Sequence, residues 1–188
     1  MKIRNHHFGK ALAVSVLMLL TGAACSTAPE TREGKAEMRR TSAEALNQAQ
    51  QNDPSLRNLI EASAGCAVFP SIGKGAVGIG GAYGKGDLYQ NGAVVGYCDM
   101  TQGTIGFQLG GQAYTEILVF ENPAAVERFK NGNFRFDAQA TAVALKSGAG
   151  ANAKFVNGVA VFTMDEAGLM FEAAVGGQKF SYQARDAR

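Results

Sequence analysis

A glycine-rich stretch with two lysines, residues 73–86, comes closest to the pattern of a known chemical site. Residues 73–78 match the GxGxxG pattern of dinucleotide-binding loops. That chemistry requires a helix to begin at the glycines, because the free amide groups of its first turn bind the pyrophosphate. Here the glycines continue into a strand pattern, and Lys74 and Lys85 are each followed by glycine rather than by serine or threonine. We therefore expect neither a dinucleotide site nor a P-loop.

Residue types suited to catalysis are sparse in the rest of the chain. The only histidines, His6 and His7, lie in an N-terminal segment that we expect to be removed, so histidine-based triads and zinc sites are excluded. Ser71 lacks the GxSxG surroundings of a hydrolase nucleophile. The acidic residues follow no spacing typical of acid–base catalysis: Asp87, Asp99, Glu116, Asp137, Asp165 and Glu166. We expect no enzyme, no cofactor and no metal; a hydrolase that uses two carboxylates is the alternative.

The N-terminus has the layout of a secretory signal peptide, which we assign to residues 1–24. Basic residues come first, followed by an apolar run over residues 11–20 and small residues up to Ala24. The apolar run is too short for a membrane-spanning helix, which needs about 20 residues. Cys25 follows directly, as in bacterial lipoprotein signals, although Gly22 stands where such signals usually have leucine. We expect lipidation of Cys25, and ordinary cleavage after Ala24 is the alternative.

Removal of this segment changes the charge and sets the expected location. It takes away three of the 18 basic residues and no acidic ones, so 15 basic residues face 16 acidic ones and the net charge becomes −1. Nucleic acid is therefore not an expected partner. Ser26 is typical of lipoproteins sorted to the outer membrane. We expect an exported lipoprotein that faces the periplasm, with residues 25–35 as lipidated N-terminus and tether; retention in the inner membrane stays open.

Two cysteines remain in addition to Cys25. Cys66 and Cys98 form an even pair in an oxidising compartment. A disulfide between them would close a loop of about 32 residues and stabilise the fold by about 3 kcal/mol. Free cysteine also behaves as a small apolar residue, so two buried thiols are an equal alternative.

Periodicity and glycine content divide the rest into helical and strand regions. Helices are predicted over residues 32–51, from Pro54 onward, and over residues 122–130. Short apolar or alternating runs predict strands at residues 66–69, 75–83, 93–100, 104–112, 114–120, 159–164, 169–175 and 179–183. Residues 65–89 and 158–182 share seven identities, which indicates two related strand-turn-strand units. The fold class is α+β: one domain over residues 36–184 with a polar tail at 185–188, and a mainly antiparallel glycine-rich sheet, open or barrel-like, covered by helices.

Glycines gather on one side of two predicted strands. In the run over residues 75–83, Gly78 and Gly80 share a face with alanines, and Gly106 and Gly110 share a face in the run over residues 104–112. Glycine within a strand often marks a close backbone approach. A packed helix or facing strand would satisfy this expectation, and so would an apolar ligand such as an acyl chain.

The combination of these segments resembles the SYLF domain family. AVFP at residues 67–70, the glycine stretch at 75–86 and GFQLGGQAYTEILVF at 106–120 carry the resemblance, which extends over roughly residues 37–182. The resemblance implies binding rather than catalysis, since family members associate with membrane lipids and some fungal ones bind actin.

The resemblance also implies where lipid would bind. Eukaryotic members use a basic amphipathic N-terminal helix, and the matching segment here holds the candidate lipid-binding residues Arg32, Lys35, Arg39 and Arg40. Lys74 and Lys85 are candidates from the residues themselves, because they flank the glycine-rich strand and would suit an anionic headgroup; two solvated lysines are the alternative. Glu33 and Glu37 nearly cancel the charge of the helix, so a solvated helix is an equal alternative. We expect a domain that binds anionic phospholipid headgroups or acyl chains; an envelope protein that binds a protein partner is the competing function.

Overall fold

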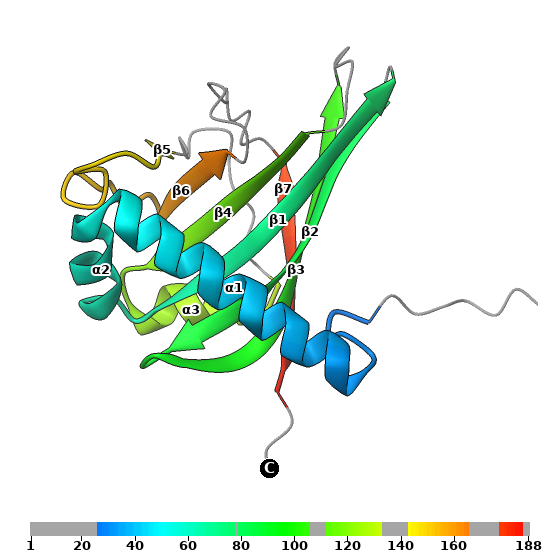
Figure 1. The fold of residues 1–188 in the computed structure, drawn as a ribbon, viewed down its shortest axis with the longest axis horizontal. Coiled ribbons are helices and arrows are strands. Elements are labelled where there is room, and N and C mark those ends of the chain that lie inside the picture. The colour runs from blue at the N-terminus through cyan, green and yellow to red at the C-terminus, as the bar shows by residue number, and fades with distance from the viewer. Residues whose placement is uncertain (1–25, 78, 106–111, 133–142, 166–176, 186–188) are drawn as a thin grey trace, which may run out of the picture.

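Figure 1 shows the fold in a computed structural model, which describes residues 26–77, 79–105, 112–132, 143–165 and 177–185. Three helices and seven strands occur in these residues, in the order α1, α2, β1, β2, β3, β4, α3, β5, β6 and β7. The predicted signal peptide, residues 1–24, and Cys25 lie outside the described residues.

Side-chain caps define where the helices begin. α1 (Arg32–Asn52) begins after Thr31, whose hydroxyl accepts a hydrogen bond from the Gly34 amide at 2.9 Å. Asp53 caps α2 (Pro54–Glu61), and Asn122 caps α3 (Pro123–Lys130). Proline follows each of these two caps and fits the first helical turn, where its missing amide leaves no partner unsatisfied. The three predicted helices are therefore confirmed.

The strands form one open sheet. They are β1 (Gly65–Val77), β2 (Ile79–Gln90), β3 (Ala93–Ile105), β4 (Gln112–Phe120), β5 (Val143–Ala144), β6 (Val159–Asp165) and β7 (Gln178–Ala184). Their order across the sheet is β5-β6-β4-β1-β2-β3-β7, and all neighbours are antiparallel except β5 and β6. The α+β class is confirmed. Within the described residues β5 and β7 do not pair, so the sheet is open rather than barrel-like.

Helices cover both faces of the sheet and give it two apolar cores (Figure 1). α1 and α2 lie on one face, where Ala49 and Leu56 pack with Val68, Val119 and other buried residues. On the opposite face α3 packs through Ala125, Val126 and Phe129, and the Phe129 ring lies 5.0 Å from that of Phe120 and 5.5 Å from that of Phe180. We call these the α1 face and the α3 face.

The glycine stretch is a hairpin rather than the single strand predicted over residues 75–83. β1 ends at Val77 and β2 begins at Ile79, and the two strands pair antiparallel from this point. Periodicity cannot distinguish these arrangements, because every strand alternates its side chains between the two faces of a sheet, whether it is one strand or one half of a hairpin. The predicted strand at 169–175 lies outside the described residues.

The internal repeat does not correspond to two similar structural units. Residues 65–89 form the β1–β2 hairpin, whereas β6 pairs with β4 and β5, and β7 pairs with β3 at the other edge. The shared residues are apolar and glycine positions that suit any strand. The prediction of two related strand-turn-strand units was therefore wrong.

The disulfide predicted as one alternative is also wrong. Cys66 and Cys98 are free and buried. β2 separates their strands, so their Cα atoms are at least two strand spacings, about 9–10 Å, apart, beyond the Cα separation of about 7 Å that a disulfide allows. They also belong to opposite cores, Cys66 on the α1 face and Cys98 on the α3 face. Burial raises the pKa of the Cys66 thiol to about 12, so it is an unreactive apolar side chain.

Candidate functional site

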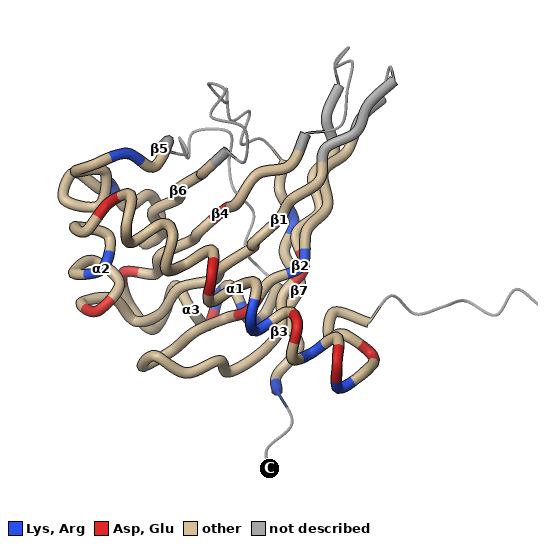
Figure 2. Tube along the Cα trace, in the orientation of Figure 1, with Lys and Arg blue, Asp and Glu red and all other residues tan. Residues whose placement is uncertain are grey.

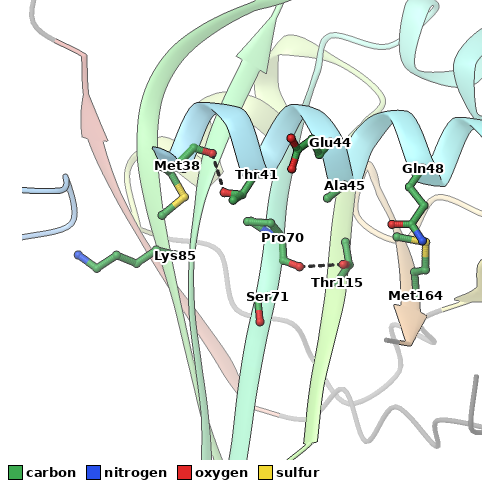
Figure 3. Close-up of a pocket in the computed structure, with 10 residues that line it drawn as sticks. All are labelled: Met38, Thr41, Glu44, Ala45, Gln48, Pro70, Ser71, Lys85, Thr115 and Met164. Atoms are coloured by element: carbon green, nitrogen blue, oxygen red, sulfur yellow. Dashed lines mark hydrogen bonds between the residues drawn. The ribbon is translucent and has the colours of Figure 1, made fainter. Parts of the chain in front are cut away.

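An open groove runs between α1 and the sheet, with a volume of about 590 Å³. Figure 3 shows its lining side chains, which come from α1, β1, β2, β4 and β6. They are Met38, Thr41, Glu44, Ala45, Gln48, Pro70, Ser71, Lys85, Thr115 and Met164. The volume lies within the range of roughly 300–1,000 Å³ that is typical of small-molecule sites. The lining combines apolar side chains with hydroxyl groups, the Gln48 amide, the Glu44 carboxylate and a lysine, which suits an amphiphilic ligand.

A bulge in β1 forms the floor of the groove. The register of β1 against both neighbours shifts near Pro70, and proline within a central strand is found essentially at such bulges. The Thr115 hydroxyl of β4 donates a hydrogen bond of 2.8 Å to the Pro70 carbonyl and thereby holds the bulge in place. Beyond it, Ser71 points along the α1 face next to Lys85, its partner on β2.

Helix α1 forms the other wall of the groove. Ser42 and Ala49 are its buried residues and face the sheet, while Met38 and Ala45 line the groove seven residues apart. Seven residues correspond to about two helical turns, so these two side chains lie on the same side of α1. Sequence reasoning missed this wall, although the spacing of Met38 and Ala45 and the strand proline Pro70 were available signals.

Lys85 connects the groove with the start of the described chain. Its stem lines the groove, while its Nζ points away from the other labelled side chains in Figure 3. The Nζ donates hydrogen bonds to the carbonyl oxygens of Ser26 at 2.6 Å and Thr27 at 3.3 Å, and it lies 3.9 Å from Oδ1 of Asp99. Of the six candidate lipid-binding residues, Lys85 is thus the one that the structure places in the groove lining.

The basic residues of α1 do not form a separate cationic surface. Figure 2 shows acidic residues interleaved with them along the first half of α1. Arg40 pairs with both Glu37 and Glu44, and these contacts raise the pKa of Arg40 and lower that of Glu37. Lys35 lies over the Tyr97 ring, with 5.7 Å between its Nζ and the ring centroid. The predicted basic strip is therefore largely engaged within the protein.

Two other candidates are Arg32 and Lys74. Arg32 is exposed in the first turn of α1. Lys74 lies in β1, where its backbone pairs with Ala82 and Gln112, and its side chain is outside the described set. Arg32 is not among the described residues that line the groove.

A buried carboxylate lies beneath α1. Asp87 is fully buried on β2, and in the described part of the chain neither of its oxygens makes a hydrogen bond of good geometry. Burial raises the pKa of Asp87 to about 6, and the nearby Ser42 hydroxyl and the charges of Arg39 and Arg185 act in the opposite direction. The Ser42 hydroxyl is close, but its geometry falls short of a hydrogen bond. The positive charge of Arg39 on α1 therefore lowers the pKa of Asp87, although the effect of burial is larger.

Of the predicted glycine face, the structure describes only Gly80. Gly80 shares the α3 face with Ala82, while Gly78, Gly106 and Gly110 lie outside the described residues. Three exposed glycines of the described strands, Gly73, Gly81 and Gly103, lie on the α1 face beyond the groove, beside Tyr83, which is 47% exposed. Nothing lies within 4 Å of the Cβ position of Gly73 or Gly103.

The close backbone approach expected at glycines occurs elsewhere in the hairpin. A Cβ atom at Gly86 would clash with the Val68 carbonyl, and one at Gly84 would lie 2.6 Å from the Ile72 side chain. These glycines let β1 and β2 pack tightly around the bulge, so the approaching group is protein rather than ligand. The alternative of a facing protein segment is thus correct at these positions.

A second, smaller cavity of about 390 Å³ lies on the other side of α1. Leu46 and Ile60 of the helices and Cys66 and Tyr89 of the sheet are among its lining residues.

Among the described residues there is no cluster of acidic, histidine or cysteine side chains that could hold a metal. None of the helices in the described ranges is long and apolar enough to cross a bilayer.

Comparison with known proteins addresses the second half of the chain. Residues 101–187 match the family Ysc84, described as Las17-binding protein actin regulator. The resemblance to the SYLF family is confirmed over these residues. The SYLF match covers β4, α3, β5, β6 and β7, and hence the groove residues Thr115 and Met164. α1, β1, β2 and Lys85 lie before it.

One curated relative extends this comparison to a bacterial protein. Beta cell expansion factor A from Aeromonas veronii is 29% identical over 72 residues, which is 38% of this chain and 28% of that protein. The matched part therefore spans less than a third of the relative. The description of the matching family names binding to another protein and regulation of actin.

Proposed function

We propose that this protein is a non-enzymatic, exported lipoprotein whose domain binds the acyl chain of an amphiphilic lipid in the α1 groove. The observation that carries the proposal is the groove itself, an open space of about 590 Å³ beside the sheet. Met38, Ala45, Pro70 and Met164 give it apolar walls, while hydroxyl groups and Lys85 stand along the same lining. This combination suits a molecule with an apolar tail and a polar head.

The proposal includes export and attachment to a membrane of the cell envelope. The signal pattern at residues 1–24 and Cys25 support export and lipid attachment, which would keep the groove beside a membrane of the cell envelope. Arg40 and Lys35 of α1 contact other side chains of the protein, so the groove carries the proposal rather than the predicted basic strip. Anionic phospholipid as the natural ligand stays a prediction.

A protein partner is the second candidate function. Gly73, Gly81 and Gly103 are exposed on the sheet, and Tyr83 stands beside them with 47% of its surface accessible. Exposed tyrosine beside bare backbone is a common feature of binding surfaces. The family description, which names a protein that binds another protein, supports this candidate as well.

A fluorescent fatty acid tests the groove directly. We expect cis-parinaric acid to bind the full chain and to be displaced by palmitate. Ala45→Trp should weaken this binding by about tenfold or more, because the indole fills the groove and excludes apolar contacts. Ala43→Trp is the matched control, since Ala43 is exposed on the same helix and does not line the groove.

The outcomes separate the two candidate functions. Loss of binding with Ala45→Trp and normal binding with Ala43→Trp would support lipid in the groove. If cis-parinaric acid does not bind the parent chain, or if both variants bind it equally well, the groove is not the lipid site and a protein partner becomes the leading function.

A further inference from the structure

The segment that precedes α1 is docked on the sheet rather than extended as the predicted tether. We call residues 26–31 the N-terminal strap. Its start is held by Lys85 through the carbonyls of Ser26 and Thr27, and Gln183 of β7 accepts a hydrogen bond from the Ala28 amide at 3.0 Å. The Ser26 hydroxyl also donates to Gln183 at 3.3 Å, and Ala28 is only 4% exposed.

The side chain of Lys85 therefore contacts both the groove and the N-terminal strap. Its stem lines the groove and its ammonium group holds the strap. The partners of this ammonium group are two uncharged carbonyls and the Asp99 carboxylate at a longer distance of 3.9 Å. Its side chain keeps 28% of its surface accessible, so a ligand can reach it.

An anionic headgroup would be a stronger partner than these carbonyls. A hydrogen bond between an ammonium group and an anionic oxygen is about twice as strong as one between neutral groups. A phosphate or carboxylate at the mouth of the groove would therefore compete with Ser26 and Thr27 for the Nζ of Lys85. Asp99 opposes the anion by charge, but at its present distance it makes no direct hydrogen bond with Lys85.

We propose that Lys85 is the headgroup-binding residue of the groove and that it exchanges the N-terminal strap for the phosphate or carboxylate of an anionic amphiphile. The inference rests on the proposed function, because the acyl chain would bring the headgroup to Lys85. Strap release and ligand binding are then coupled, and this coupling is reciprocal: whatever loosens the strap strengthens binding of the anion.

Strap release also changes how the domain is attached. Residue 25 directly precedes the strap, so a docked strap fixes the point where the chain leaves the domain. Once released, residues 26–31 lengthen the connection between residue 25 and α1. Ligand binding would thereby free the domain to move relative to its N-terminal attachment.

A spin label on the strap measures this exchange. We would place a nitroxide at Glu30→Cys in the full chain that also carries Cys25→Ser; Glu30 is exposed, while Cys66 and Cys98 are buried and do not compete for the label. The probes are phosphatidylcholine vesicles, mixed phosphatidylglycerol and phosphatidylcholine vesicles, and inorganic phosphate. We expect the mixed vesicles to mobilise the label and neutral vesicles to leave it unchanged.

The phosphate arm distinguishes the source of the anion. Mobilisation by inorganic phosphate alone would support the Lys85 site and identify free phosphate as sufficient, whereas mobilisation by mixed vesicles only would support a lipid headgroup. A label that stays immobile at saturating amounts of both anions would overturn the proposal. If cis-parinaric acid fails to bind but phosphate still releases the strap, the acyl-chain groove fails while the Lys85 site stands.

Two variants test the reciprocity. Gln183→Ala loosens the strap without touching the groove lining, and we expect it to strengthen binding to mixed vesicles by about threefold. Lys85→Gln should weaken that binding by about threefold to tenfold and leave the label mobile in the absence of ligand. Lys146→Gln, an exposed lysine away from the groove, is the control. Equal vesicle affinity of Lys85→Gln and Lys146→Gln would contradict the assignment.

Discussion

Two buried aspartates show how the surroundings of a residue determine its chemistry. Asp53 accepts hydrogen bonds from the Gly148 and Gly150 amides and from Ser55. Burial raises the pKa of Asp53, but these hydrogen bonds outweigh it and the pKa lies below its ordinary value. Asp87 lacks such donors in the described part of the chain, so burial dominates and its pKa rises to about 6.

The sign of the pH dependence follows from Asp87. Its pKa in the folded state lies above the ordinary value of 3.8, so the folded state binds the proton more tightly and stability falls as pH rises from about 4 to about 6. Asp87→Asn should therefore increase the free energy of unfolding by about 1–2 kcal/mol near pH 7.5 and have little effect near pH 4. Urea denaturation at the two pH values checks this.

An exposed carboxylate provides the comparison for Asp87. Glu121→Gln changes an exposed side chain, and we expect it to leave the stability nearly unchanged at both pH values. An equal gain for Asp87→Asn at both pH values would show that titration of this carboxyl does not limit the stability of the fold.

At the scale of elements, Asp53 joins three segments. Its side chain caps α2, and its backbone amide donates a hydrogen bond to the Ala49 carbonyl at the end of α1. Its carboxylate accepts hydrogen bonds from the amides of Gly148 and Gly150, which lie far along the chain. Asp53→Ala should decrease the free energy of unfolding by about 2–4 kcal/mol, because the cap and buried amide partners are lost together. Thermal or urea denaturation measures the loss.

The cap of α1 is the matched control for this prediction. The Thr31 side chain satisfies only the Gly34 amide and is exposed, so Thr31→Ala should cost about 1 kcal/mol or less. If both alanine variants lose the same stability, Asp53 acts only as a helix cap and its link to residues 148–150 contributes nothing measurable.

At the scale of the whole molecule, membrane attachment separates into the anchor and the domain. We expect the parent chain to incorporate palmitate and to remain in the membrane fraction after a high-salt wash. Cys25→Ser should remove the label and move most of the protein to the soluble fraction, since lipid attachment supplies most of the membrane affinity. Cell fractionation with palmitate labelling measures both effects.

A different distribution would change the assignment of the membrane contact. Cys25→Ser protein that stays in the membrane fraction at high salt would show that the domain itself provides a salt-resistant membrane contact. Loss of attachment on adding salt alone, in the parent chain, would point to electrostatic contact rather than a covalent anchor.

The sequence by itself determined the helices and most strands of this protein, because caps, prolines and periodicity are local signals. The Asn122-Pro123 start of α3 and the Asp53-Pro54 start of α2 show this clearly. The glycine-lysine stretch could also be rejected as a nucleotide site, since its failure lies in neighbouring residues. The SYLF resemblance rested on motifs in the same way, and the family match over residues 101–187 confirms it.

Only the tertiary structure decided which of these residues meet. The order of the strands places β2 between Cys66 and Cys98 and separates β6 from β7, and no local pattern encodes that order. The groove joins α1 to the bulge at Pro70, and Lys85 meets Ser26 across 59 positions of sequence. Such contacts depend on how the whole chain packs. The contact of Lys35 with the Tyr97 ring could therefore not be predicted from the charge pattern of α1, whereas the pairing of Arg40 with Glu37 is local to the helix.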